Sequence, residues 1–172
     1  MREPHTDRYQ FGVVHTITTM SERDVVSVER VIAAEPAAIF DLLADPSRHC
    51  DIDGSGSVVA AKGGSERLAL GSTFGMSMKM GLPYSMVSTV IEFDEDRLIA
   101  WQTTGPTAIG KHVGGRIWRY QLEPVDGGTK VTESWDIRHE SAFTKPLVRQ
   151  GAKKTGENMA ATLERIEQVL SA

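Results

Sequence analysis

The feature that most constrains the fold is an alternating hairpin near the end of the chain, followed by an amphipathic helix. Large apolar residues occupy every second position of Trp118–Pro124, and the same alternation returns in Val131–Ile137. Between these segments lies Asp126-Gly127-Gly128-Thr129, whose glycines suit a tight turn. The alternation predicts two half-buried antiparallel strands. A long helix after such strands predicts a curved sheet packed against that helix, an arrangement that often leaves a cavity between the two layers.

The terminal helix is expected to begin near Thr144, a possible cap, with Pro146 in its first turn. Apolar and small residues then recur at steps of three or four, which places them on one helical face. This face consists of Val148, Ala152, Thr155, Met159, Leu163, Ile166 and Leu170. Gly151 and Gly156 each weaken the helix by about 1 kcal/mol relative to alanine. Their small size would let another group approach the helix.

The earlier part of the chain predicts one strand, a short helical region and then more strands. Val25–Ala33 alternates and is rich in β-branched residues, so it is expected to be a strand. Pro36 suits the first turn of a helix that Pro46 ends, and a short second helical turn is expected at Pro46–Cys50. The remaining expected strands are Val58–Lys62, Ser72–Met80, Tyr84–Phe93, Leu98–Thr104, Arg116–Glu123 and Lys130–Arg138, with a loop at Gly105–Gly115.

Length and charge narrow the class of protein. A chain of 172 residues fits one domain with a sizeable core, and its net charge of −4 gives no long-range attraction for nucleic acid or an anionic membrane. No apolar run approaches the ~20 residues of a membrane span. The single cysteine, Cys50, excludes an internal disulfide and favours a reducing compartment. We therefore expect a cytoplasmic protein, a monomer or homodimer, without nucleic-acid partners or stable membrane insertion.

The first residues differ in composition from the rest. Residues 1–19 are mostly polar, lack the apolar core of a signal peptide, and precede Met20, which could itself be a natural start. They are expected to form a tail or an added edge segment, while residues 20–172 form the ligand-binding domain.

The sequence argues against a metal site. Asp51–Val58 resembles the start of a calcium-binding EF-hand loop, with oxygen ligands at positions 1, 3 and 5 and a glycine at position 6. Position 12, however, is Lys62 where a bidentate glutamate is needed, and Gly63-Gly64 follows instead of a helix. We expect a polar turn here. The five histidines show no zinc-ligand spacing, so neither a metal nor another cofactor is expected.

Two charged residues share strand faces with aromatic residues. Because alternate residues of a strand point to the same face, Arg116 shares a face with Trp118 and Tyr120, and Glu133 shares a face with Trp135. An unpaired buried charge costs several kcal/mol, so inward-facing charges should pair or meet water in a cavity. The alternative is that both lie at the edge of the sheet in solvent.

The apolar side chains on these faces are either plain core or the lining of a pocket. The expected lining is Phe74, Met76, Met78, Met80, Trp101, Thr103, Trp118, Tyr120, Trp135 and Met159. In an enzyme, Arg116 would polarise a carbonyl group, and Glu133 or His112 would move a proton.

These features together resemble the helix-grip superfamily, also called SRPBCC or START-like, which contains polyketide cyclases, START lipid-transfer domains and pollen-allergen-type plant proteins. The bacterial polyketide cyclase/dehydrase-like group is the most similar. The segments that carry the resemblance are Val28–Phe40, Leu43–Arg48, Asp94–Trp101, Trp118–Pro124 and Gly127–Ser134. The resemblance implies an α+β fold of about seven antiparallel strands, curved around a long C-terminal helix, with two short helices after the first strand.

The resemblance does not select one activity, because fold alone does not determine function. It implies an internal pocket for a small hydrophobic or aromatic molecule, and three roles stay open. The first is a carrier or binding protein without chemistry. The second is a polyketide cyclase, aromatase or dehydratase. The third is an interaction module of the same fold, which should expose an apolar patch outside the pocket.

Overall fold

The computed structural model describes residues 23–62, 66–105 and 114–172. Residues 1–19 and His112 therefore lie outside the described residues. The elements, in chain order, are β1 Val25–Ile32, α1 Pro36–Ala44, the short 3-10 helix η1 Pro46–Arg48, α2 His49–Ile52, β2 Val58–Lys62, β3 Thr73–Met80, β4 Leu82–Asp94, β5 Leu98–Thr104, β6 Gly114–Val125, β7 Gly128–Asp136, α3 Lys145–Gln150 and α4 Ala152–Leu170.

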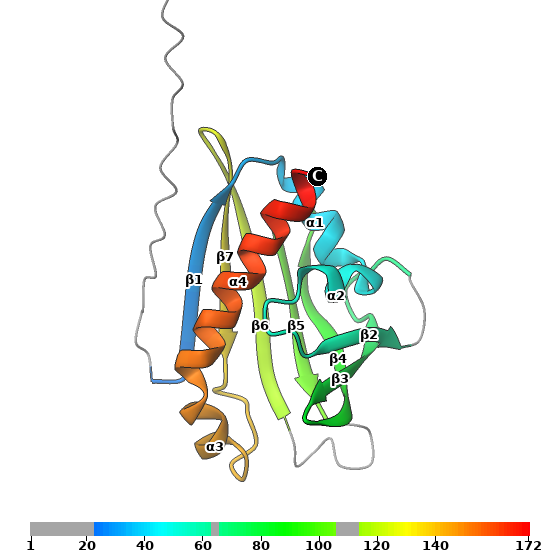
Figure 1. Cartoon of the computed structure of the whole chain (residues 1–172), viewed down its shortest axis with the longest axis vertical. Helices are drawn as coiled ribbons and strands as arrows, with labels where there is room; N and C mark the ends of the chain where they lie inside the picture. Colours follow the sequence, from blue (N-terminus) through cyan, green and yellow to red (C-terminus); the bar gives the residue numbers. More distant parts are fainter. Residues whose placement is uncertain (1–22, 63–65, 106–113) are drawn as a thin grey trace, which may run out of the picture.

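Seven antiparallel strands form one sheet in the order β1-β7-β6-β5-β4-β3-β2. The sheet curves around α4, and α1 and α2 lie beside that helix (Figure 1). Strand β1 pairs with β7 because the short helices carry the chain across to the far edge of the sheet, from which the later strands return one after another. The expected α+β architecture is confirmed.

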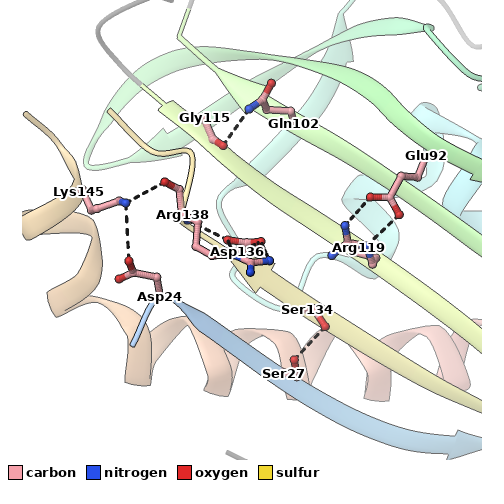
Figure 2. Close-up of polar contacts among 10 residues, drawn as sticks. All are labelled: Asp24, Ser27, Glu92, Gln102, Gly115, Arg119, Ser134, Asp136, Arg138 and Lys145. Carbon is pink, nitrogen blue, oxygen red and sulfur yellow. Dashed lines mark hydrogen bonds and ion pairs between the residues drawn. The ribbon is translucent and has the colours of Figure 1, made fainter. Parts of the chain in front are cut away.

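The two faces of the sheet differ in chemistry. The outer row through Glu92, Ala100, Arg119 and Ser134 carries an ion pair, in which the guanidinium of Arg119 donates from Nε to Glu92 Oε2 at 3.1 Å. The hydroxyls of Ser27 and Ser134 lie 2.9 Å apart in the same region. Figure 2 shows these polar contacts on the sheet with α4 behind it. The opposite, concave face is therefore the one that packs against α4.

The terminal helix differs from the continuous helix expected. It is divided at Gly151 into α3 and α4, whose buried residues begin only at Met159. Glycine carries a high entropic cost within a helix, which makes this position a natural place for the division. The N-terminal half of α4 presents small residues instead, and a Cβ at Gly156 would lie 3.3 Å from Val26 of β1. The missing side chain of Gly156 thus lets α4 approach β1 closely.

Candidate functional site

The concave face carries a continuous aromatic cluster. The indole of Trp101 stacks on the His49 ring at 5.3 Å between centroids and contacts the Tyr120 ring at 5.5 Å. Phe74 meets both His49 and Trp101 edge to face. Aromatic contacts of this kind add specific geometry to apolar burial. The cluster joins α2 to strands β3, β5 and β6.

Glu133 on β7 is the most unusual residue of this face. Its side chain is 2% exposed, and register places it directly opposite Tyr120. The Tyr120 hydroxyl donates to Glu133 Oε1 at 2.8 Å. Among the described residues, Glu133 Oε2 has no hydrogen-bond partner and is fully buried. A buried polar atom without a partner costs about 1–3 kcal/mol, so it calls for a functional explanation.

The environment of Glu133 favours its neutral form. Burial raises the pKa of Glu133 from its ordinary value of 4.5 to about 8, the negative charge of Asp53 adds to the rise, and the Tyr120 hydrogen bond opposes it. Burial likewise raises the pKa of Tyr120 well above its ordinary value, with a further contribution from the Glu133 charge. At pH 7 the pair is therefore a carboxylic acid beside a phenol.

His49 is a buried member of the cluster that no sequence pattern identifies. Its Nε2 lies 2.9 Å from the Leu43 carbonyl, so that nitrogen carries the hydrogen. Burial lowers the pKa of His49, and the Leu43 hydrogen bond opposes this effect. A neutral imidazole stacked on Trp101 results. The sequence offered no signal for it, because the position lies in a short helical turn without a motif.

Arg116 does not pair with Glu133. Its guanidinium instead binds both carboxylate oxygens of Glu140, with Nε at 3.1 Å and the second nitrogen at 3.2 Å. Thr144 also donates to Glu140, at 2.6 Å. The two-residue turn after Val125 sets a register that pairs Tyr120 with Glu133, which leaves Arg116 four residues away along β6. At about 3.3 Å per residue this exceeds the reach of a direct contact. Of the arrangements expected for these two charges, a direct Arg116–Glu133 pair is therefore wrong, and Arg116 instead binds the segment after β7 through Glu140.

The predicted lining residues fall into three groups. The buried ones are Phe74, Met76, Trp101, Thr103, Tyr120 and Trp135 on the sheet and Met159 on α4. Met78 and Trp118 are partly buried. Met80 is 74% exposed, so its expected place in a lining is wrong. It lies at the tip of the β3–β4 hairpin, beside Gly81, where the strands project beyond the opposing layer.

Burial decreases along the concave face toward this hairpin. Near the other end, Val131 is 0% exposed. At the hairpin end, the Met78–Tyr84 pair is only partly covered, and Tyr84 is 39% exposed. Met159 is the first buried residue of α4. The open part lies at the end of the sheet occupied by α3 in Figure 1.

An open depression lies at the opposite end of the sheet. It has a volume of about 600 Å³ and lies between the β1–α1 connection and the β6–β7 turn. Residues 33–36 and 124–128, mostly small or apolar, line it. The aromatic cluster and the buried carboxyl lie elsewhere, so we place the candidate site on the concave face.

The turn after α2 is polar, as expected. Asp53 accepts from the Ser55 amide at 2.9 Å and from the Val58 amide at 2.8 Å, which occupies its oxygens with the turn itself. Over the described part of the chain, no group of three or more histidine, cysteine, aspartate or glutamate residues is arranged to hold a metal. Within the same residues, no helix is long and apolar enough to cross a membrane.

Comparison with known proteins agrees with this architecture. Residues 23–171 match the family described as polyketide cyclase / dehydrase and lipid transport. The chain belongs to this family. The match spans every described helix and strand, from β1 to α4.

A relative by sequence and solved structures of similar fold extend the comparison. An uncharacterized protein of Mycobacterium tuberculosis, Rv0088, is 32% identical over 141 residues, which cover 78% of this chain and 59% of the relative. The chain thus spans 59% of the length of the curated relatives it matches. The crystal structure of CV1439 from Chromobacterium violaceum has a TM-score of 0.67 at 13% identity, covering 87% of this chain and 98% of that one. The crystal structure of protein Ms6760 from Mycobacterium smegmatis has a TM-score of 0.64 at 19% identity, covering 93% of this chain and 96% of that one. These similarities show the shared fold.

Proposed function

We propose that the protein binds a small hydrophobic or aromatic molecule between the concave face and α4, at the open end near the β3–β4 hairpin. The observation that carries this proposal is the decrease in burial along one apolar face. Phe40 and Leu163 are almost completely buried in the core, whereas Met78 and Trp118 are only partly buried. An uncovered apolar and aromatic face within a concave fold is typical of ligand sites.

The rim of this opening is also apolar. Met80 and Leu82 at the hairpin tip are 74% and 80% exposed, and Phe143 and Leu147 lie exposed near α3. Large exposed apolar side chains often mark binding surfaces. We assign them to the entrance through which the ligand passes.

Binding of the dye Nile red, which fluoresces strongly in apolar sites, tests the proposal. Met78→Lys places a charge on the concave face and is expected to weaken dye binding at least tenfold. Ser77→Lys is the matched control, because the neighbouring residue of β3 points to the other face and should leave binding unchanged. Circular dichroism melting of both variants checks that they fold. Equal binding by folded Met78→Lys and wild type, or no binding by the wild type, would contradict the proposal.

The Tyr120–Glu133 pair favours a second candidate, a cyclase- or dehydratase-type enzyme. A buried carboxyl with a pKa of about 8 is suited to general acid–base chemistry near neutral pH. The ionised form of Glu133 would take a proton from the carbon between two carbonyls of a bound β-diketone and become the carboxylic acid. That acid, after exchanging its proton with solvent, would return a proton to the same carbon and become the carboxylate again. Exchange of that carbon-bound hydrogen for deuterium, followed by NMR, measures this step. The enzyme hypothesis predicts acceleration by the wild type and loss of it in Glu133→Gln.

A further inference from the structure

The oxygens of Glu133 differ in their contacts. Oε1 accepts the Tyr120 hydroxyl at 2.8 Å, whereas Oε2 is buried and has no partner among the described residues. Across the sheet, Glu133 is paired with Val28 of β1, an apolar residue. Neither neighbouring strand therefore supplies a second hydrogen bond.

The charged groups around Glu133 come from few elements. Tyr120 of β6 bonds to it, and Asp53 in the turn after α2 acts on it as a negative charge. The arginines of the concave face are engaged elsewhere, since Arg30 pairs with Glu167 of α4 and Arg116 pairs with Glu140. A nearby negative charge and burial both favour the protonated carboxyl.

The position of the proton follows from the hydrogen bonds. The Tyr120 hydroxyl uses its only hydrogen on Oε1, so Oε1 is the accepting oxygen. The acidic hydrogen of a neutral Glu133 then belongs on Oε2, where it can donate to one more acceptor. Such a donor in an apolar site selects ligands that bring an oxygen acceptor to it.

We propose that Glu133, held by Tyr120, donates a hydrogen bond from Oε2 to the carbonyl oxygen of a hydrophobic or aromatic ketone. This inference rests on the proposed function, because it names the ligand class of the same site. A ligand entering with a carboxylate would meet Asp53 and no free cation of the described concave face, so the neutral carbonyl is the matching group. A hydrocarbon of the same shape would leave the donor without a partner.

Two probes of equal shape test the inference by displacement of Nile red. Acetylnaphthalene carries a ketone, and isopropenylnaphthalene replaces its carbonyl oxygen by a CH₂ group. At pH 6 the wild type is expected to bind the ketone about tenfold more tightly, which corresponds to one well-formed hydrogen bond to a buried donor. This preference should decrease as the pH rises through about 8, where Glu133 loses its proton.

Two substitutions separate the donor from the shape of the site. Glu133→Leu removes the donor and should bind both probes equally. Glu133→Gln keeps an N–H donor at this position, so it should retain the preference and lose its dependence on pH.

Each outcome decides between the proposals. Failure of the wild type to bind either probe contradicts the proposed function as well. Equal binding of both probes by the wild type at pH 6 contradicts the inference alone, and is the result expected if a buried water satisfies Oε2. A preference that survives in Glu133→Leu would place the recognition of the carbonyl on another residue and overturn the inference.

Discussion

Replacing Glu133 by glutamine should stabilise the protein increasingly as the pH rises. The folded state holds a proton on Glu133 up to a pH of about 8, whereas an unfolded glutamate releases it near 4.5. Because the folded state binds more protons between these values, the wild type loses stability as the pH rises through this range. Below a pH of about 4.5 both the folded and the unfolded protein hold the proton, so the wild type keeps the full stability of the neutral Glu133 side chain. Glutamine has nearly the same shape and no such transition.

The magnitude follows from the two pKa values. Each pH unit between the two pKa values lowers the free energy of unfolding of the wild type by about 1.36 kcal/mol. The loss relative to low pH reaches about 3 kcal/mol at pH 7 and about 5 kcal/mol above pH 8. Entry of water beside the ionised carboxylate would reduce these values. At pH 4 the two proteins should have free energies of unfolding within about 1 kcal/mol of each other, since both present a neutral side chain to Tyr120.

Urea unfolding followed by circular dichroism at pH 4, 7 and 9 measures this difference. Comparing variant with wild type at each pH cancels the titration of all other groups. Glu164→Gln makes the same replacement on the exposed surface of α4 and is the matched control. A constant difference between Glu133→Gln and the wild type at all three pH values would refute the assignment of a buried, proton-holding carboxyl.

Two further predictions concern the support of the site. Arg116→Met leaves the buried carboxylate of Glu140 without its partner and should lower the free energy of unfolding by about 2 kcal/mol. Adding Glu140→Gln should restore much of this loss, and the preference for the ketone probe should not change. Gly54→Ala should cost more than about 2 kcal/mol in urea unfolding, because its Cβ would lie 2.2 Å from the Asn158 carbonyl oxygen of α4. Gly56→Asn is its control, since that position is open and asparagine tolerates its φ of +67°.

The sheet was predictable because its pattern is local. Alternation in the last hairpin defines which side chains share a face, and the two-residue turn Asp126-Gly127 fixes how its strands pair. From this register Tyr120 lies opposite Glu133. Opposite charge suggests Arg116 as a partner for Glu133, whereas position along the hairpin identifies the phenol of Tyr120.

Other parts of the site depend on tertiary placement that sequence patterns do not contain. His49 reaches Trp101 only because η1 and α2 turn the chain under the sheet. Met80 follows the same alternation as Met76, yet the opposing layer ends before it. Periodicity gives the face on which a residue lies and not whether another element covers that face.

Contacts between a bound ketone and the protein test the central claim most directly. With methionine methyl groups and tryptophan indoles labelled for NMR, acetylnaphthalene should show intermolecular nuclear Overhauser effects to Met78 and Trp118. The resonance of its carbonyl carbon should move downfield at pH 6, as expected for a hydrogen bond from Glu133, and return in Glu133→Leu. Contacts confined to Met80 and to residues of the outer face would contradict a ligand site between the sheet and α4.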